Sequence, residues 1–333
     1  MSNPKIAVIG LGFMGAKWSR LIAENGLIDL AVVSDLRTDV GEQLASAYEA
    51  EFCPDPMEAA GHPDVDGVVV CTPEHLHVEI AMTAIESGKA LAVEKPIAHT
   101  LEAAERMTDR AEEAGVPLLA GHVLRFEPRY AAIRNAIDAG EIGEVQAVRS
   151  ERIGLVADQE ILRGRTSIAL YYGVHEFDIA RWYAGDVATV AAARSSGVVR
   201  SQGYDVEDLY SAVLTFRSGA HGTAMIGWSL PPKTPGYGLA GFTVIGDSGV
   251  LQVRQGTTGF MKVLGDGPSD ADIYYSPEVH GSLYGALGIE VDHFARVVRG
   301  EADPVCTGSD GTEALRLSLA MEEAARTGEA VKL

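Results

Sequence analysis

The stretch "KIAVIGLGFMG" at residues 5–15 decides the fold of the first part of the chain. A short apolar run ends at Gly10, and Gly12 and Gly15 complete the spacing GxGxxG. Glycines at these places permit a tight turn, a close approach of backbone N–H groups to a pyrophosphate, and close packing of a helix on a strand. The stretch therefore predicts a strand, a phosphate-binding turn and the start of a helix, in that order.

The first 122 residues continue this alternation of short apolar runs and helical patterns. Several runs are apolar at every position, as expected of parallel strands that are buried on both faces. Alternating strands and helices predict right-handed βαβ units and a doubly wound parallel sheet of the Rossmann type. The expected strands are 5–10, 29–35, 66–72, 90–95 and 117–122, and the expected helices are 15–25, 40–49, 76–87 and 100–114.

The pattern changes after residue 122, where long alternating runs predominate. Strands in series predict an α+β domain with a large, open and mainly antiparallel sheet. The motif "RSG" at 217–219 predicts a hairpin turn between two of these strands. We expect a dinucleotide-binding domain at 1–122 and a domain for substrate binding and oligomerisation at 123–333. The expected strands lie within 144–153, 187–196, 209–228 and 242–253, and the expected helices are 128–143, 284–299 and 310–327. The last of these helices can pack back on the first domain.

Composition excludes several classes of function. The formal net charge of -20 repels phosphate backbones and anionic lipid, so neither a nucleic-acid nor a membrane partner is expected. The three cysteines, Cys53, Cys71 and Cys306, have no CxxC spacing, which argues against a zinc site or a disulfide framework. We expect no metal, no signal peptide and no transmembrane segment, and a location in the reducing cytoplasm.

An acidic residue completes the predicted nucleotide site. Asp35 ends the second expected strand, and a carboxylate there can accept both ribose hydroxyls of NAD while it repels the extra phosphate of NADP. Arg37 could instead pair with that phosphate, so NADP remains possible beside NAD. The turn residues Phe13 and Met14 belong to the same predicted cofactor site.

A lysine stands at the end of another buried strand, in "ALAVEKP" (90–96). Next to a nicotinamide, Lys95 could hydrogen-bond a substrate hydroxyl and stabilise a developing alkoxide. The alternative is a surface lysine paired with Glu94.

The segments "GLGFMG", "CTPEHLHVEIAMTAIESGKALAVEKP" and "GVHEFDIARW" together resemble the glucose–fructose oxidoreductase, inositol dehydrogenase and rhizopine catabolism (Gfo/Idh/MocA) family, over nearly the whole chain. The resemblance implies a Rossmann domain, a second domain whose sheet often mediates dimers or tetramers, and NAD(P)-dependent chemistry at a ring hydroxyl or ketone of a sugar or cyclitol. It also implies that Lys95 is the catalytic lysine. By the same resemblance Glu94 and Pro96 line the nicotinamide, and Thr72, Pro73 and His77 lie beside the cofactor.

His175 is the predicted general base. A helix that starts near Gly173 would present His175 from its first turn, where the positive helix terminus favours a neutral imidazole able to accept a proton. Inositol dehydrogenase-like members carry an aspartate four residues before this histidine, and here that residue is Tyr171. We predict His175 as the base and Tyr171 as a second catalytic residue that touches the substrate, the alternative being a structural histidine.

The remaining polar candidates suggest how a substrate is bound. A group of arginines near a glycine-bearing loop could meet a phosphate or carboxylate, or could pair with acidic residues of the protein itself. The substrate candidates are Arg125, His122, Arg152, Arg163 and Tyr284, with Arg165 in the same loop as Arg163.

Three functions remain open from the sequence. The leading one is NAD(P)-dependent hydride transfer at a ring hydroxyl or ketone of a sugar or an inositol-like cyclic polyol. A nucleotide-sugar 3-dehydrogenase or ketoreductase is the alternative that the arginines favour. A non-catalytic NAD-binding regulator belongs to another class, and the presence of both Lys95 and His175 argues against it. We expect a homodimer or homotetramer formed through the C-terminal sheet.

Overall fold

The computed structural model describes residues 2–156, 162, 164–232, 234, 238–255, 261–264, 267–270 and 272–333. These residues form two compact units. The first comprises Met1–Phe126 and Tyr274–Thr312, and the second comprises Glu127–Ile273 and Glu313–Leu333. The chain therefore returns to the first unit near its end. The expected domain boundaries, 1–122 and 123–333, stay a prediction.

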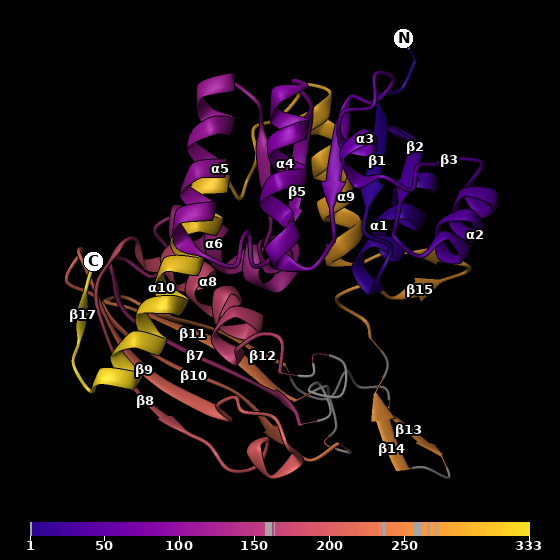
Figure 1. The fold of residues 1–333 in the computed structure, drawn as a ribbon. Helices are drawn as coiled ribbons and strands as arrows, with labels where there is room; N and C mark the ends of the chain where they lie inside the picture. Colours follow the sequence, from indigo (N-terminus) through magenta and orange to yellow (C-terminus); the bar gives the residue numbers. More distant parts are fainter. Residues whose placement is uncertain are drawn as a thin grey trace. The chain divides into compact units, whose positions relative to one another are not determined.

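The first unit is built on a six-stranded sheet in which every pair of neighbours is parallel (Figure 1). The strand order β3-β2-β1-β4-β5-β6 reverses its direction between β1 and β4, and such a switch point is where open parallel sheets bind ligands. The strands are β1 (Lys5–Ile9), β2 (Asp29–Ser34), β3 (Glu51–Phe52), β4 (Gly67–Val70), β5 (Ala90–Glu94) and β6 (Leu118–Gly121). The predicted doubly wound sheet is confirmed.

The helices of this unit form two series of neighbours, α2–α1–α9 and α3–α4–α5. They are α1 (Phe13–Ala23), α2 (Thr38–Tyr48), α3 (Pro56–Ala60), α4 (His77–Glu86), α5 (Leu101–Ala114) and α9 (Ala286–Val298), with the 3₁₀ turns η1 (Glu74–Leu76) and η2 (Val123–Phe126). The predicted limits of α5 are confirmed, since the Thr100 hydroxyl accepts from the Ala103 N–H and Gly115 ends the helix at a φ of 65°.

The sequence patterns missed two short elements, β3 and α3. The signal for α3 was present, because Asp55 accepts from the N–H groups of Met57 and Glu58, and Pro56 occupies the first helical position. A five-residue helix is too short to show a helical period, and only its cap identifies it.

The second unit holds a seven-stranded sheet with the order β12-β11-β7-β10-β9-β8-β17. The pair β7 and β10 is parallel and the other pairs are antiparallel, so the prediction of a mainly antiparallel sheet is confirmed. The strands are β7 (Val145–Leu155), β8 (Val187–Ser195), β9 (Leu209–Phe216), β10 (His221–Leu230), β11 (Leu239–Gly246), β12 (Val250–Gln255) and β17 (Val331–Lys332). The hairpin predicted at 217–219 joins β9 to β10. Two further ribbons pair β13 (Met261–Leu264) with β14 (Gly267–Asp270) and, in the first unit, β15 (Glu278–Val279) with β16 (Ser282–Leu283).

Helices cover one face of the second sheet (Figure 1). They are α6 (Pro128–Asp138), α8 (Val174–Ala184) and the part of α10 (Gly308–Thr327) that belongs to this unit. The unit also contains the short turns η3 (Ala169–Gly173) and η4 (Arg200–Gln202). The helix expected at 128–143 ends at Asp138, and Gly140 follows with a φ of 72°. The other face carries exposed apolar side chains from neighbouring strands, Val213, Met225, Ile245 and Val250. Among the described helices, none combines the length and the apolar character needed to cross a membrane.

Candidate active site

The glycine turn lies at the switch point of the first sheet, between β1 and β4. Gly10 has a φ of 89°, and a Cβ there would lie 2.7 Å from the Thr72 nitrogen. A Cβ on Gly15 would lie 1.7 Å from the Gly10 carbonyl oxygen, so no side chain fits at either position. A Cβ on Gly12 would meet nothing within 4 Å, so the middle of the turn faces open space. Gly12 is also the N-cap of α1 and offers no side chain to the first N–H groups, which suits an anionic ligand.

Aromatic residues and one lysine lie around this turn. Phe13 is exposed, and the Lys17 ammonium lies 4.5 Å from its ring centroid and 5.2 Å from that of Tyr275. The Tyr275 hydroxyl donates to the Met14 sulfur at 2.9 Å, and Lys17 donates to the Ser276 hydroxyl. The segment that contains Tyr275 therefore packs against the residues of the glycine turn. The sequence patterns missed this contact because Tyr275 lies far along the chain.

Asp35 stands just after β2 and accepts three kinds of donor. Its carboxylate takes the Leu11 N–H at 2.7 Å, the Arg37 N–H at 2.9 Å and the Arg37 guanidinium at 3.0 and 3.1 Å. Burial by itself raises the pKa of Asp35, but the hydrogen bonds from Arg37 and Leu11 outweigh it and hold that pKa below its usual value. The carboxylate is therefore ionised at neutral pH and tied to the glycine turn.

His77 joins the loops that follow β4 and β5. Its ring is buried, with Nε2 2.7 Å from the Thr72 carbonyl oxygen and Nδ1 3.1 Å from the Pro96 carbonyl oxygen. Burial lowers the pKa of His77, so the neutral ring donates its one N–H, and the shorter distance places that proton on Nε2. His77 thus positions Thr72, Pro73 and Pro96. The buried Thr72 hydroxyl has no hydrogen-bond partner among the described residues and is available to a ligand.

Glu94 and Lys95 end β5 in different surroundings. Lys95 is half-buried, whereas the Glu94 side chain enters the core. The Glu94 carboxylate accepts from the Trp18 indole N–H at 3.2 Å and from the Lys95 backbone N–H at 3.3 Å. Burial raises the pKa of Glu94, although Lys95 and Trp18 oppose that change. Because Glu94 is buried, the alternative of a surface ion pair with Lys95 does not describe this site.

The segment before His175 differs from the expectation. Residues 169–173 form a π-helical turn, η3, that continues directly into α8, and the Val174 N–H bonds to the Ala169 carbonyl. The helix start predicted near Gly173 is confirmed, and His175 lies in the first turn of α8. The N-terminus of α8 is not free, because the preceding turn continues into it and bonds the Val174 N–H. His175 is half-buried. The Tyr171 ring packs on Tyr172 and Trp228, with centroids 4.8 and 6.3 Å away. π-helical turns of this kind occur frequently at functional sites.

A buried ion pair lies next to His175 in the second unit. The Glu176 side chain is 1% exposed, and its carboxylate accepts from the Arg152 Nε at 2.6 Å. Burial raises the pKa of Glu176, and the contacts with Arg152 and Ser150 oppose this change. Sequence reasoning missed Glu176 as a partner of Arg152, because the two residues belong to a helix and a strand with no local signal that joins them.

Comparisons with known proteins cover both halves of the chain. The family model described as an oxidoreductase family with an NAD-binding Rossmann fold matches residues 4–122, and the C-terminal alpha/beta domain of the same oxidoreductase family matches residues 134–333. The chain belongs to the Gfo/Idh/MocA oxidoreductase family. The predicted family, fold class and NAD-binding oxidoreductase character are thereby confirmed.

Relatives in this family align end to end with the chain. It is 28% identical to a scyllo-inositol 2-dehydrogenase (NAD(+)) from Bacillus subtilis, with 99% of this chain and 96% of that protein covered. It is 27% identical to an inositol 2-dehydrogenase from Rhizobium meliloti, with 94% of each covered. Among solved structures, a probable dehydrogenase from Thermotoga maritima is 26% identical and superposes with a TM-score of 0.83 over 98% of each chain.

The residues of the Gfo/Idh/MocA first domain fit an NAD cofactor. Open space faces Gly12, the carboxylate of Asp35 is ionised, and the buried Thr72 hydroxyl has no partner among the described residues. These three features would hold a pyrophosphate, accept ribose hydroxyls and bond a further polar group of the cofactor, respectively.

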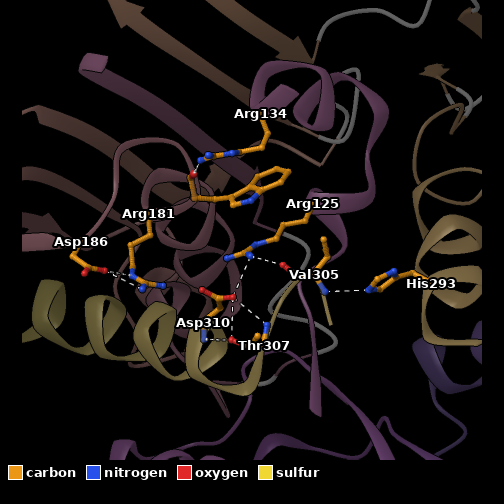
Figure 2. Close-up of polar contacts among 9 residues, drawn as sticks. Arg125, Arg134, Arg181, Asp186, His293, Val305, Thr307 and Asp310 are labelled. Carbon is orange, nitrogen blue, oxygen red and sulfur yellow. Dashed lines mark hydrogen bonds and ion pairs between the residues drawn. The ribbon is translucent and has the colours of Figure 1, made fainter. Parts of the chain in front are cut away.

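The substrate candidates differ in their burial and in their contacts. Arg125 is buried, and its Nη1 donates to the Val305 carbonyl oxygen at 2.7 Å and to the Asp310 carboxylate at 3.2 Å, as Figure 2 shows. Arg125 therefore holds the first turn of α10 and the residues just before it, and Arg152 is likewise bound by Glu176. The other candidates are His122, which is buried, Tyr284, which is exposed, Arg165, which is exposed, and Arg163, which lies outside the described residues.

Proposed function

We propose that this protein oxidises a ring hydroxyl of an inositol-like cyclic polyol with NAD. The observation that carries the proposal is the position of Lys95, half-buried at the carboxyl end of β5, one strand from the switch point. Ligands of open parallel sheets bind at such ends, and an ammonium group there can meet a reacting oxygen. The end-to-end similarity to proteins named inositol 2-dehydrogenase supports the choice of a cyclitol.

The proposed reaction assigns one task to each catalytic residue. A bound NAD would supply the hydride acceptor for the carbinol carbon. Lys95 donates a hydrogen bond to the hydroxyl oxygen and stabilises its developing negative charge. His175 takes the hydroxyl proton, as a neutral imidazole can at neutral pH. Tyr171, held among Tyr172 and Trp228, offers its phenol to a second hydroxyl of the substrate in place of the aspartate that inositol dehydrogenase-like members carry.

NAD is the proposed cofactor because Asp35 is ionised and sits where the adenosine ribose of a dinucleotide is expected. A second negative charge on the ribose would be repelled by that carboxylate. Two of the arginines on which the nucleotide-sugar alternative depends are Arg152, which is paired with Glu176, and Arg163, which lies outside the described residues. No described contact favours that alternative.

We also propose a homodimer or homotetramer that forms through the uncovered face of the second sheet. Val213, Met225, Ile245 and Val250 share this face, and an apolar sheet face is commonly buried by a second copy. A cytoplasmic location is proposed as well, because Cys53, Cys71 and Cys306 form no disulfide.

The test uses the full chain with NAD and a panel of myo-inositol, scyllo-inositol, aldoses and UDP-sugars, with NADH absorbance as the readout. We expect turnover with an inositol. His175→Ala should lower kcat by about 10²–10⁴-fold, the usual contribution of a general base, with little change in NAD affinity. The matched control is His62→Ala, since His62 is half-buried like His175 and lies beside the exposed Glu51.

Other outcomes would overturn parts of the proposal. NAD binding without NADH formation from any sugar or polyol would favour the non-catalytic regulator. Turnover only with UDP-sugars would favour the nucleotide-sugar alternative. Undiminished kcat in His175→Ala would remove His175 from the role of base.

A further inference from the structure

A second buried glutamate lies in the first unit, and the proposed reaction does not use it. Glu290 on α9 is 0% exposed, and neither of its carboxyl oxygens has a hydrogen-bond partner among the described residues. An ionised carboxylate buried without a partner is costly, and proteins usually avoid that cost by protonating the group. Glu290 is therefore either an unfavourable feature of the packing or a protonated acid with a functional role.

The neighbours of Glu290 connect it to the end of β5. Helix α9 contacts both α1 and β5. One turn after Glu290, Phe294 meets Trp18 of α1 edge to face, with centroids 6.1 Å apart, and the Trp18 indole N–H donates to the Glu94 carboxylate. Glu290, Trp18 and Glu94 thus belong to one buried cluster directly behind the strand end that presents Lys95.

The titratable groups of this cluster are all acids. Besides burial, the charge of Glu94 on β5 raises the pKa of Glu290, and both carboxyls raise the pKa of the Cys71 thiol, which follows β4. The side chain that faces the pair from α1 is Trp18, which is not titratable. Burial and then the charge of Glu94 raise the pKa of Glu290 well above its usual value. Because Glu290 is fully buried and no described group donates to its carboxyl, it keeps its proton at neutral pH.

Glu94 is the better site for the negative charge of the pair. It accepts from the Trp18 indole N–H and from the Lys95 N–H, and it has the positive charge of Lys95 nearby. Glu290 has none of these donors. The proton therefore resides mainly on Glu290, whose O–H is the donor that can face Glu94.

We propose that Glu290 is a positioning residue that, as a neutral acid, shares its proton with Glu94 and so holds Glu94, and with it Lys95 and Pro96, in place for the cofactor and the substrate. The neutral state of Glu290 rests on its burial and on the missing donors among the described residues, whereas its consequence for turnover rests on the proposed function of Lys95. The two parts are tested separately.

The acid pair is tested by infrared spectroscopy of the full chain. We expect the C=O stretching band of a protonated carboxyl at neutral pH in the wild type, and its loss in Glu290→Gln. The matched control is Glu86→Gln, because Glu86 is exposed at the end of α4. A spectrum in which Glu290→Gln removes no such band would overturn the proposal.

The dependence of stability on pH gives a second test of the pair. Because the folded state raises the pKa of Glu290, its contribution to stability is fully present below the unfolded pKa and is lost as pH rises toward the folded pKa. For one proton the unfolding equilibrium constant changes about tenfold per pH unit over that range. Glu290→Gln should therefore gain stability relative to the wild type as pH rises, in urea unfolding. Parallel curves for the two proteins would contradict the proposal.

The positioning role is tested by NAD affinity and by turnover. Glu290→Gln keeps an N–H donor, so its Kd for NAD and its kcat should stay within about threefold of the wild type. Glu290→Leu removes the donor, so its NAD affinity and its kcat should fall about tenfold or more, because small misplacements of reacting groups slow a reaction strongly. If only the size of the side chain mattered, the two variants would have similar NAD affinity and kcat. Near wild-type values with glutamine and reduced values with leucine therefore indicate the positioning role. Equal behaviour of the two variants would overturn the positioning role, and NAD binding keeps this test valid if no substrate is turned over.

Discussion

Lys95 and His175 each have a buried glutamate beside them in the sequence, and the two units hold these glutamates in opposite ways. Glu176, next to His175, has a cation, the Arg152 guanidinium at 2.6 Å. Glu94, next to Lys95, has an indole N–H at 3.2 Å and a second carboxyl, Glu290, in the same cluster. Burial raises the pKa of both glutamates. The partner therefore decides the outcome: a cation keeps Glu176 ionised, and a second acid makes the other pair keep a proton.

The two pairs should differ in how much a mutation destabilises the protein. The Arg152–Glu176 pair is neutral overall only while both members are present, so the removal of one leaves a buried charge without compensation. The Glu94–Glu290 pair can adjust by gaining or losing its shared proton. We therefore expect the second unit to be the more sensitive of the two to mutation at its buried glutamate.

The largest effect is expected for Arg152→Met. Loss of the guanidinium should cost about 3–5 kcal/mol of unfolding free energy, because Glu176 is left buried without its cation. Urea unfolding at neutral pH measures it. The control is Arg149→Met on the same strand, whose side chain is exposed and which lies 4.0 Å from Glu151. The double variant Arg152→Met/Glu176→Leu should recover most of the loss, and a double variant as unstable as the single one would break the comparison.

A smaller effect is expected for Trp18→Phe in the first unit. Phenylalanine keeps the aromatic contact with Phe294 but removes the N–H that reaches Glu94, at a cost of about 1.5–3 kcal/mol for a hydrogen bond to a charged group. The same unfolding measurement applies. Trp228→Phe is the matched control, because its indole N–H donates to a neutral backbone carbonyl, that of Glu207, and should cost less. If Trp18→Phe cost more than Arg152→Met, the expected order of the two units would be reversed.

The smallest effect is expected for Arg37→Ala, which removes an arginine–carboxylate pair near the surface. The Arg37 side chain is 57% exposed, so the change in unfolding free energy at neutral pH should stay below about 1 kcal/mol. The folded state lowers the pKa of Asp35, so what the pair contributes is present above the unfolded pKa and is lost as pH falls through the folded pKa. Unfolding at neutral and acid pH, with NAD and NADP affinities beside it, measures both aspects. A loss of unfolding free energy as large as that of Arg152→Met would show that burial does not explain the difference between the Arg37–Asp35 and Arg152–Glu176 pairs.

The sequence patterns predicted the parts of the site that are local. "GLGFMG" after an apolar run, and Asp35 after the next strand, located the glycine turn and its carboxylate, and the structure shows why Gly10 and Gly15 admit no side chain. The helix at His175 was also expected, but the π-helical turn before it was not, since an inserted helical residue leaves no mark in the apolar period. Arg125 is a substrate candidate by sequence, and only its contacts with Val305 and Asp310 in the folded chain show that it binds the protein itself.

Apolar periods, glycine spacing and cap residues act within a few positions of one another, and they suffice to predict two folds in series, a nucleotide turn and the catalytic candidates. The charge states of the buried glutamates depend in addition on residues remote in sequence: Arg152 for Glu176, Trp18 for Glu94, and Glu94 for Glu290. A buried carboxyl takes its ionisation from whichever group the packed chain places beside it, and no local pattern carries that information. The pairing of these groups across strands and helices is therefore a property of the folded chain alone.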